Sequence, residues 1–175
     1  NIWLGPEERQ YVHALQDFAH RLDPGVKMAK VALGGPQARE VRAYGLRSDK
    51  RAAVYLHHGA CAECAKTPAG QPRRHNWDHD RGDVNGLQVT VDVPQAAKGY
   101  WYSPTDAAIL ARFDVPAGQQ AFTAPPFKVD LALLITEAGP PDIDGDGKPN
   151  DLDDDDDNDG APDATDAFPL EREEQ

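Results

Sequence analysis

Several kinds of residue are scarce in this 175-residue sequence, and each shortage excludes a class of protein. Two cysteines are too few for a small scaffold held together by many disulfides. No apolar run reaches the ~18 to 20 residues that a membrane-spanning helix needs. The longest run, VDLALLIT, has the length of a β-strand. We therefore expect a protein without a membrane span.

Basic residues are also few, with 18 Lys and Arg against 30 Asp and Glu. Residues 137–175 hold 16 of the acids and 2 of the bases, a net charge of −14, so the rest of the chain carries +2. Neither part offers the concentrated basic surface that binds nucleic acid or an anionic membrane. We therefore expect no nucleic-acid partner. Residue 1 is Asn rather than Met, from which we expect a processed or excised chain.

An amphipathic helix is predicted near the N-terminus, in the segment GPEERQYVHALQDFAHRLDP. Its apolar residues recur at intervals of three and four, at Tyr11, Leu15, Phe18 and Leu22. The Asp-Pro pair that follows predicts the end of the helix before Asp23. Such a helix needs an apolar surface to pack against.

Seven short runs rich in β-branched and aromatic residues follow, separated by Gly, Pro, Asp and Ser. They are VRAYGLRS, RAAVYLHH, LQVTVDVP, GYWYSP, AILARFDVP, QAFTAPP and VDLALLIT. Because no helical pattern separates them, they predict a mainly β fold, an antiparallel sandwich, rather than a parallel sheet. The expected organisation is a helical segment over 1–30, a sandwich over 31–137 with an inserted loop at 59–86, and a tail over 138–175.

The acidic tail contains two copies of one pattern, DIDGDGKPNDLD and DDDNDGAPDATD. Each has Asp at positions one, three, five and twelve, Gly at six, Pro at eight, and Asn or Asp at nine. Calcium takes six to eight oxygen ligands at roughly 2.3 to 2.6 Å, and Gly permits the sharp bend around the ion. The expected ligands are the side chains of Asp142, Asp144, Asp146, Asn150 and Asp153, those of Asp155, Asp157, Asp159, Asp163 and Asp166, and the main-chain carbonyls of Lys148 and Ala161.

These loops differ from EF-hands, which place Glu at position twelve and flank the loop with helices. Pro149 and Pro162 oppose helix continuation. The pattern resembles the thrombospondin type 3 repeat, and DAFP at 166–169 is similar to the usual exit from such repeats. The resemblance implies a secreted or cell-surface protein whose tail binds about two or more Ca²⁺ ions and lacks regular secondary structure. A solvated acidic tail is the alternative, but it predicts no fixed spacing of Gly and Pro.

The inserted loop carries both cysteines in a CxxC pattern, Cys61 and Cys64, followed by His75 and His79. Two lone cysteines outside the cell more often pair, so we expect a disulfide between Cys61 and Cys64. A zinc site formed by Cys61, Cys64, His75 and His79 and a pair of free thiols remain as alternatives.

No catalytic constellation is recognised in the sequence. Glycosidases need two carboxylates that face each other across the sugar. Glu137 directly follows VDLALLIT, but the chain lacks the alternating strands and helices of a barrel, so Glu137 is expected to cap the last sandwich strand. No GxSxG, P-loop or dinucleotide-binding motif occurs.

Three segments together carry a family resemblance: HALQDFAHRLDPGVKMAK, VRAYGLRSDKRAAVYLHH and GYWYSPTDAAILARFDVPAGQQAFTAPPFKVDLALLI. They resemble the C-terminal part of secreted (β/α)8-barrel glycoside hydrolases that carry a β-sandwich, sometimes labelled a collagen-binding domain. Matching positions are Trp101, Tyr102, Ser103 (where Asp is usual) and Pro104, with Phe122, Thr123, Pro125 and Pro126. The resemblance covers about residues 11–136 and implies a catalytic barrel upstream of Asn1. The insertion rich in His and Cys departs from the family pattern.

The expected function is that of a non-catalytic accessory region of an extracellular polysaccharide-degrading enzyme, with the calcium-loaded tail as a rigid spacer. Its expected partners are polysaccharide or an upstream catalytic domain. An adhesion protein without an attached enzyme and a hydrolase with its active site in this chain are the alternatives. Among aromatic residues that can stack on sugar rings, Trp77 in the inserted loop is the expected exposed one. Trp101 is expected in the core, because the alternation of side chains along a strand buries about half of its aromatic residues.

Overall fold

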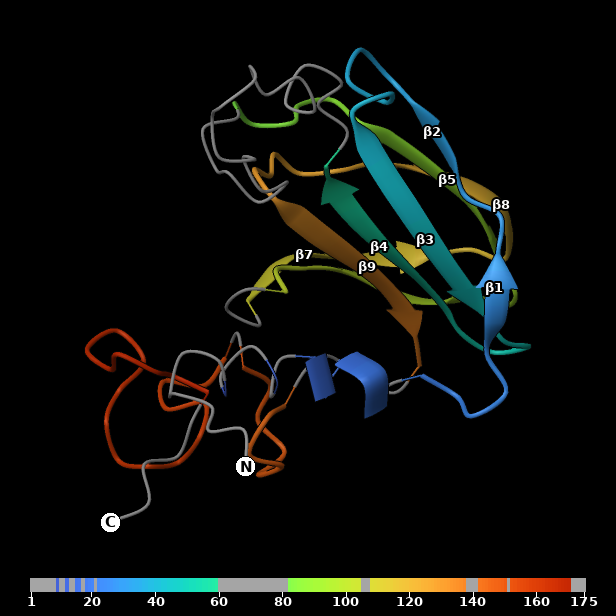
Figure 1. Cartoon of the computed structure of the whole chain (residues 1–175). Coiled ribbons are helices and arrows are strands. Elements are labelled where there is room, and N and C mark those ends of the chain that lie inside the picture. Colours follow the sequence, from blue (N-terminus) through green and yellow to red (C-terminus); the bar gives the residue numbers. More distant parts are fainter. Residues whose placement is uncertain are drawn as a thin grey trace, which may run out of the picture.

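The computed structural model describes residues 9, 12, 15, 16, 18–20, 22–59, 82–104, 108–137, 142–150 and 152–170 (Figure 1). Its strands are β1 (Lys27–Ala29), β2 (Ala32–Gly34), β3 (Val41–Arg47), β4 (Ala52–His58), β5 (Gln88–Val93), β6 (Ala97–Tyr102), β7 (Ile109–Val115), β8 (Gly118–Thr123) and β9 (Asp130–Thr136). They form a six-stranded sheet in the order β1-β3-β4-β9-β6-β7 and a three-stranded sheet in the order β2-β5-β8. Neighbouring strands in both sheets are antiparallel, which confirms the predicted mainly β fold.

Each of the seven predicted runs is a strand, from β3 to β9. The sequence did not predict β1 and β2, which are three residues long and lie between the helix and β3. Gly45 allows this segment to cross β3 closely, because a Cβ at Gly45 would lie 2.7 Å from the main-chain oxygen of Ala29. The short strands are therefore held by tertiary contact rather than by a local hydrophobic pattern.

The predicted N-terminal helix is confirmed at the positions that the structure describes between residues 9 and 20, all of which are helical. Leu22 donates its amide hydrogen to the carbonyl of Ala19 at 3.1 Å, in the turn that leads out of the helix. The helix lies beyond one end of β9, with the tail beside it (Figure 1). No helix in the described part of the chain is long and apolar enough to cross a membrane.

The core lies between the two sheets. Residues of β4 and β9, such as Leu56, Leu131 and Leu133, are completely buried there against Val89 of β5. Trp101 is buried in the same cluster, as predicted. The sandwich is therefore held mainly by apolar burial between its layers, which is the usual arrangement for this architecture.

The outer face of the six-stranded sheet is also covered, over β6 and β9. Tyr100 packs there against Phe18 and Leu22 of the helical segment. Next to it, Tyr102 packs against Ile143 and Leu170 of the tail. Burial on both faces accounts for the uninterrupted apolar run of β9, since a strand buried on one face alternates with polar residues.

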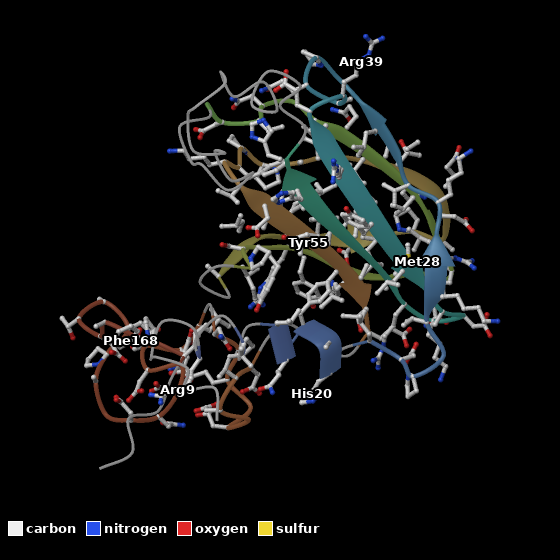
Figure 2. The ribbon with its side chains drawn as sticks, in the orientation of Figure 1. Arg9, His20, Met28, Arg39, Tyr55 and Phe168 are labelled. Atoms are coloured by element: carbon white, nitrogen blue, oxygen red, sulfur yellow. The ribbon has the colours of Figure 1, made fainter. Side chains whose placement is uncertain are left out.

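This packing changes two expectations from the sequence. Tyr100 and Tyr102 are buried along with Trp101, so none of the three is available to stack on a sugar. The tail also returns to the sandwich instead of standing away from it as a spacer, because Leu170 is 1% exposed in the cluster with Tyr102. Figure 2 shows Phe168 in the tail and His20 on the helix, both beyond the same end of the sheet.

Candidate metal centre in the acidic tail

The backbone of the tail repeats itself with a period of 13 residues. Residues 142–150 and 152–170 contain turns and bends but no helix or strand, as the sequence predicts. Positions four and six of both loops have positive φ angles, at Gly145 (77°) and Gly147 (95°) and again at Asn158 (56°) and Gly160 (98°). Gly adopts this conformation freely, and Asn tolerates it better than most residues. The predicted bend at position six is therefore present in both loops.

Side-chain oxygens at the same positions accept hydrogen bonds from the same backbone amides in both loops. The amide of position six donates to the first carboxylate, from Gly147 to Asp142 Oδ2 at 3.2 Å and from Gly160 to Asp155 Oδ2 at 3.0 Å. The amide of position two donates to the side-chain oxygen of position nine, from Ile143 to Asn150 at 3.0 Å and from Asp156 to Asp163 at 2.9 Å. These matching bonds make the two loops structurally equivalent.

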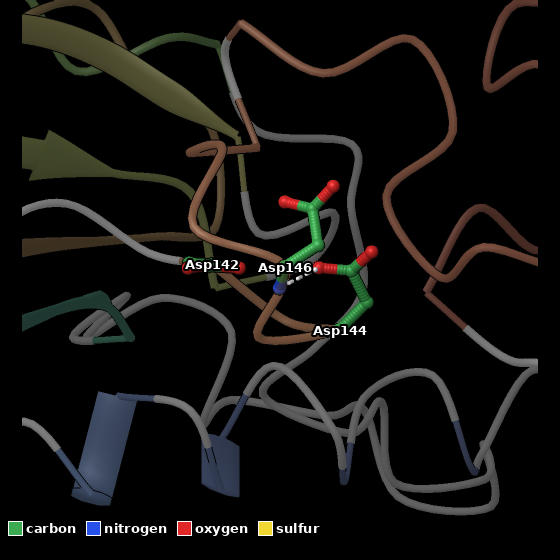
Figure 3. A group of neighbouring side chains, drawn as sticks. All are labelled: Asp142, Asp144 and Asp146. Atoms are coloured by element: carbon green, nitrogen blue, oxygen red, sulfur yellow. Dashed lines mark hydrogen bonds between the residues drawn. The ribbon is translucent and has the colours of Figure 1, made fainter.

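The first three predicted acids of each loop converge. Asp142, Asp144 and Asp146 each place an oxygen within 4.8 Å of the others, and so do Asp155, Asp157 and Asp159. Figure 3 shows the first group, in which the amide of Asp146 donates to Asp144 Oδ1 at 2.9 Å. Oxygen donors gathered in this way around one bend suit a hard cation.

The second loop contains a buried carboxylate without a counter-charge. Asp157 is 6% exposed, and its Oδ2 atom has no hydrogen-bond partner among the described residues. Burial raises the pKa of Asp157 to about 6. Asp166 Oδ2, at position twelve of the same loop, is likewise buried and unpartnered within the described part of the chain. Since a buried, unpaired carboxylate is unfavourable, this loop needs a cation or protons.

The first loop differs because Lys148 occupies its position seven. The Lys148 ammonium group lies 2.9 Å from Asp153 Oδ1, at position twelve. This hydrogen bond lowers the pKa of Asp153 and raises that of Lys148. The equivalent of Lys148 in the second loop is Ala161, which has no charge to offer Asp166. Lys148 therefore pairs with one predicted calcium ligand of the first loop, whereas Ala161 cannot pair with the equivalent ligand of the second. The second loop is thus better prepared to bind a cation.

Asp156 was not predicted from the sequence, because position two lies outside the repeated pattern. The equivalent residue in the first loop is Ile143, which packs against the sandwich. Asp156 is 9% exposed, and its Oδ1 atom has no partner among the described residues. Burial, followed by the nearby charges of Asp163, Asp153 and Asp144, raises its pKa to about 7. The sequence offered one signal, which is that position two is apolar in the first loop and acidic in the second.

The two loops contact each other directly. The side-chain amide of Asn158 in the second loop donates to Asp144 Oδ2 in the first. The amide of Asp163 in the second loop also donates to the carbonyl of Asp154, the residue between the two loops, at 2.9 Å. Asn158 therefore joins the second loop to a carboxylate of the first.

The remaining predicted site residues lie elsewhere. Cys61, Cys64, His75, His79 and Trp77 are outside the described residues, so the disulfide, the zinc alternative and the sugar contact stay predictions. Glu137 is exposed directly after β9, as expected of a residue that caps a strand. The described residues outside the tail contain no cluster of three or more metal-ligating side chains.

No protein-family model and no curated protein matches the sequence. Solved structures that match the chain include glycoside hydrolases. One is named only as a glycoside hydrolase, with 17% identity and a TM-score of 0.44 over 71% of this chain and 24% of its own. A GH30 endoxylanase from Clostridium papyrosolvens has 14% identity and a TM-score of 0.41, over 74% of this chain and 28% of its own.

A glycoside hydrolase family 5 protein from Bacteroides vulgatus has 14% identity and a TM-score of 0.43, over 79% of this chain and 28% of its own. This chain thus spans 24% to 28% of the length of these three proteins. The similarity is too low to assign the chain to any of their families.

Proposed function

We propose that this chain is a calcium-binding, non-catalytic accessory region of an extracellular polysaccharide-degrading glycoside hydrolase. The observation that supports calcium binding most directly is the buried oxygen of Asp157, which lacks a partner among the described residues and belongs to a group of three converging carboxylates. A cation in this position would remove the cost of burying the charge.

The chemistry of the ligands favours calcium over other metals. Both groups consist of carboxylates, whereas zinc prefers nitrogen and sulfur ligands. Magnesium requires nearly ideal octahedral geometry and keeps several waters, whereas calcium accepts six to eight oxygens from a flexible loop. Carbonyl and side-chain oxygens of positions seven, nine and twelve would complete the shell in each loop.

The way the tail is attached supports a structural role for it. Ile143 belongs to the first loop, Leu170 follows the second, and both pack against Tyr102 on the sheet. Calcium in the loops would hold these two apolar side chains in place and keep the outer face of the sheet covered. The link to a glycoside hydrolase is supported by the sequence resemblance around Trp101 and Phe122.

Calorimetric titration of the chain with Ca²⁺ tests the ion sites. Asp157→Asn should remove the tighter binding event, because it takes a charge from the buried group of the second loop. Asp154→Asn is the matched control, since it removes the same charge from an exposed residue of the tail that is not a predicted ligand. Equal affinities for the wild type and Asp157→Asn, or no binding at all, would contradict the proposal.

The non-catalytic part of the proposal has its own test. The chain is assayed for hydrolysis of soluble polysaccharides, next to Glu137→Gln. We expect no activity in either protein. Hydrolysis that disappears in Glu137→Gln would show an active site in this chain and would overturn the accessory role.

A further inference from the structure

Three aromatic rings form a bent row on the outer face of the six-stranded sheet, first across two strands and then along one. Tyr44 of β3 lies directly opposite Tyr55 of β4, and His57 is two residues further along β4. The ring centroids are 6.3 Å apart for Tyr44 and Tyr55 and 6.5 Å apart for Tyr55 and His57. Since side chains alternate along a strand and Leu56 points into the core, Tyr55 and His57 point outward.

The middle ring of the row is fixed by a polar contact. The Tyr55 hydroxyl donates to Asp130 Oδ2 on β9 at 3.0 Å, and the rings of Tyr55 and His57 are within 8° of parallel. Gly59 leaves room for the imidazole, because a Cβ there would lie 2.5 Å from His57 Cδ2. A surface whose rings are already fixed loses little conformational entropy when a ligand binds.

The row lies beyond the part of this face that the helix and the tail cover over β6 and β9. Across the strands, Tyr44, Tyr55, Ala132 and Tyr102 stand opposite one another in register. The tail covers Tyr102 and Ala132 through Leu170, whereas Tyr44 is 46% exposed. In Figure 2, Tyr55 lies on the sheet face that is turned toward the viewer, away from the helix and the tail.

We propose that Tyr44, Tyr55 and His57 form a binding site for a neutral polysaccharide chain. This inference rests on the proposed role in polysaccharide degradation. The faces of aromatic rings carry partial negative charge and attract the C–H groups on the flat side of a pyranose. A row of rings offers successive platforms to successive sugar units.

The charges around the row favour an uncharged ligand. Exposed Arg42 stands opposite His57 on one side, and Asp130 stands opposite it on the other, so the two charges offset each other. The guanidinium of Arg42 and the imidazole of His57 supply hydrogen bonds for sugar hydroxyls. An acidic polysaccharide would gain one charge contact and suffer one repulsion.

Binding is measured by calorimetry and affinity electrophoresis in calcium, with mixed-linkage β-glucan, arabinoxylan and galactomannan as neutral probes and polygalacturonate as the charged one. Loss of one ring should weaken binding roughly 3- to 10-fold. We therefore expect that reduction in Tyr44→Ala and Tyr44→Leu for the neutral probe that binds. Tyr44→Trp should bind at least as well as the wild type.

Leu110→Ala is the matched control, because Leu110 is 47% exposed and lies on β7 of the same sheet. Its binding should equal that of the wild type. Failure of the wild type to bind any neutral probe, binding of polygalacturonate alone, or an equal loss in Leu110→Ala would overturn the site.

Calcium affinity of the same Tyr44 variants is measured in parallel and should be unchanged. Sugar binding that fails while calcium binding is retained overturns this site alone. Calcium binding that fails while sugar binding is retained overturns the ion sites alone.

Discussion

The sandwich and the tail are stabilised in opposite ways. The sandwich buries a continuous set of apolar side chains between two sheets, with Leu56, Leu131 and Leu133 fully enclosed. The tail instead satisfies its backbone amides with carboxylates and attaches to the sandwich through Ile143 and Leu170. We expect the first part to fold without ions and the second to need them.

The largest effect is expected from an apolar deletion in the sandwich. Leu133→Ala leaves a cavity at a completely buried site and should lower the free energy of unfolding by about 2–5 kcal/mol. Urea denaturation followed by circular dichroism measures it. Leu152→Ala, at a tail residue that is 61% exposed, is the control and should change stability by less than about 0.5 kcal/mol. Comparable losses in both variants would remove the distinction between the two regions.

Removal of calcium should act on the tail and its anchor. A ligand present at 100 times its dissociation constant stabilises the folded state by about 2.7 kcal/mol, and a chelator removes that contribution. Hydrogen exchange should therefore accelerate in residues 142–170 when EDTA is added. Amides of β5 and β8, in the sheet away from the tail, provide the internal control. Unchanged exchange in the tail would contradict an ion-dependent structure.

The two loops differ in Lys148, which is present only in the first. Lys148→Ala frees Asp153 for the ion and should tighten the weaker calcium-binding event by roughly 2- to 5-fold, the size of an exposed ion pair. Titration calorimetry resolves the two events. Lys98→Ala breaks the surface pair with Asp114 on the sandwich and should leave both unchanged. Tightening in Lys98→Ala as well would indicate a general effect of net charge.

The smallest effect concerns pH. The pKa values of Asp157, about 6, and Asp156, about 7, lie above the ordinary aspartate value of about 3.9. A raised pKa in the folded state means that protonation favours folding, so the ion-free tail should lose stability as pH rises from about 4 through 7. Calcium binds the deprotonated carboxylates, so its affinity should rise over the same window.

Asp156→Asn isolates the contribution of Asp156 to this pH dependence. It keeps the shape of the side chain and removes the charge, so the ion-free protein should lose less stability between pH 5 and pH 7.5 than the wild type does. Denaturation in EDTA at several pH values measures this. An identical pH dependence in the wild type and the variant would show that Asp156 does not titrate in this range.

The sequence predicted the strands of the sandwich well, because β-branched and aromatic runs bounded by Gly and Pro are local signals. It failed for β1 and β2, whose residues carry no such pattern. β1 pairs with β3, where Gly45 allows the close approach of Ala29, and β2 pairs with β5 in the other sheet. It also missed that Tyr100 and Tyr102 are buried together with Trp101. Strand alternation predicts that one face of the sheet is exposed to solvent. The helix and the tail cover part of that face through tertiary contacts, which a local pattern does not reveal.

The positions of the acids in the candidate site could be predicted from the sequence, whereas the pairing and burial of their charges could not. The spacing of Asp and Gly predicted the convergence of the first three acids of each loop, whereas the acids predicted at positions nine and twelve are not part of these groups. The capture of Asp153 by Lys148 and the burial of Asp156 depend on how side chains pack in three dimensions. The Tyr44 and Tyr55 pair was likewise missed, because the two residues lie on different strands and meet only through the register of β3 and β4.

Native mass spectrometry of the chain after dialysis against calcium counts the ions that the tail holds. Calcium binding by both loops predicts two bound ions in the wild type, one in Asp157→Asn, two in Asp154→Asn and none after treatment with chelator. A wild-type chain that carries no calcium under these conditions, or an Asp157→Asn chain that retains both ions, would contradict it.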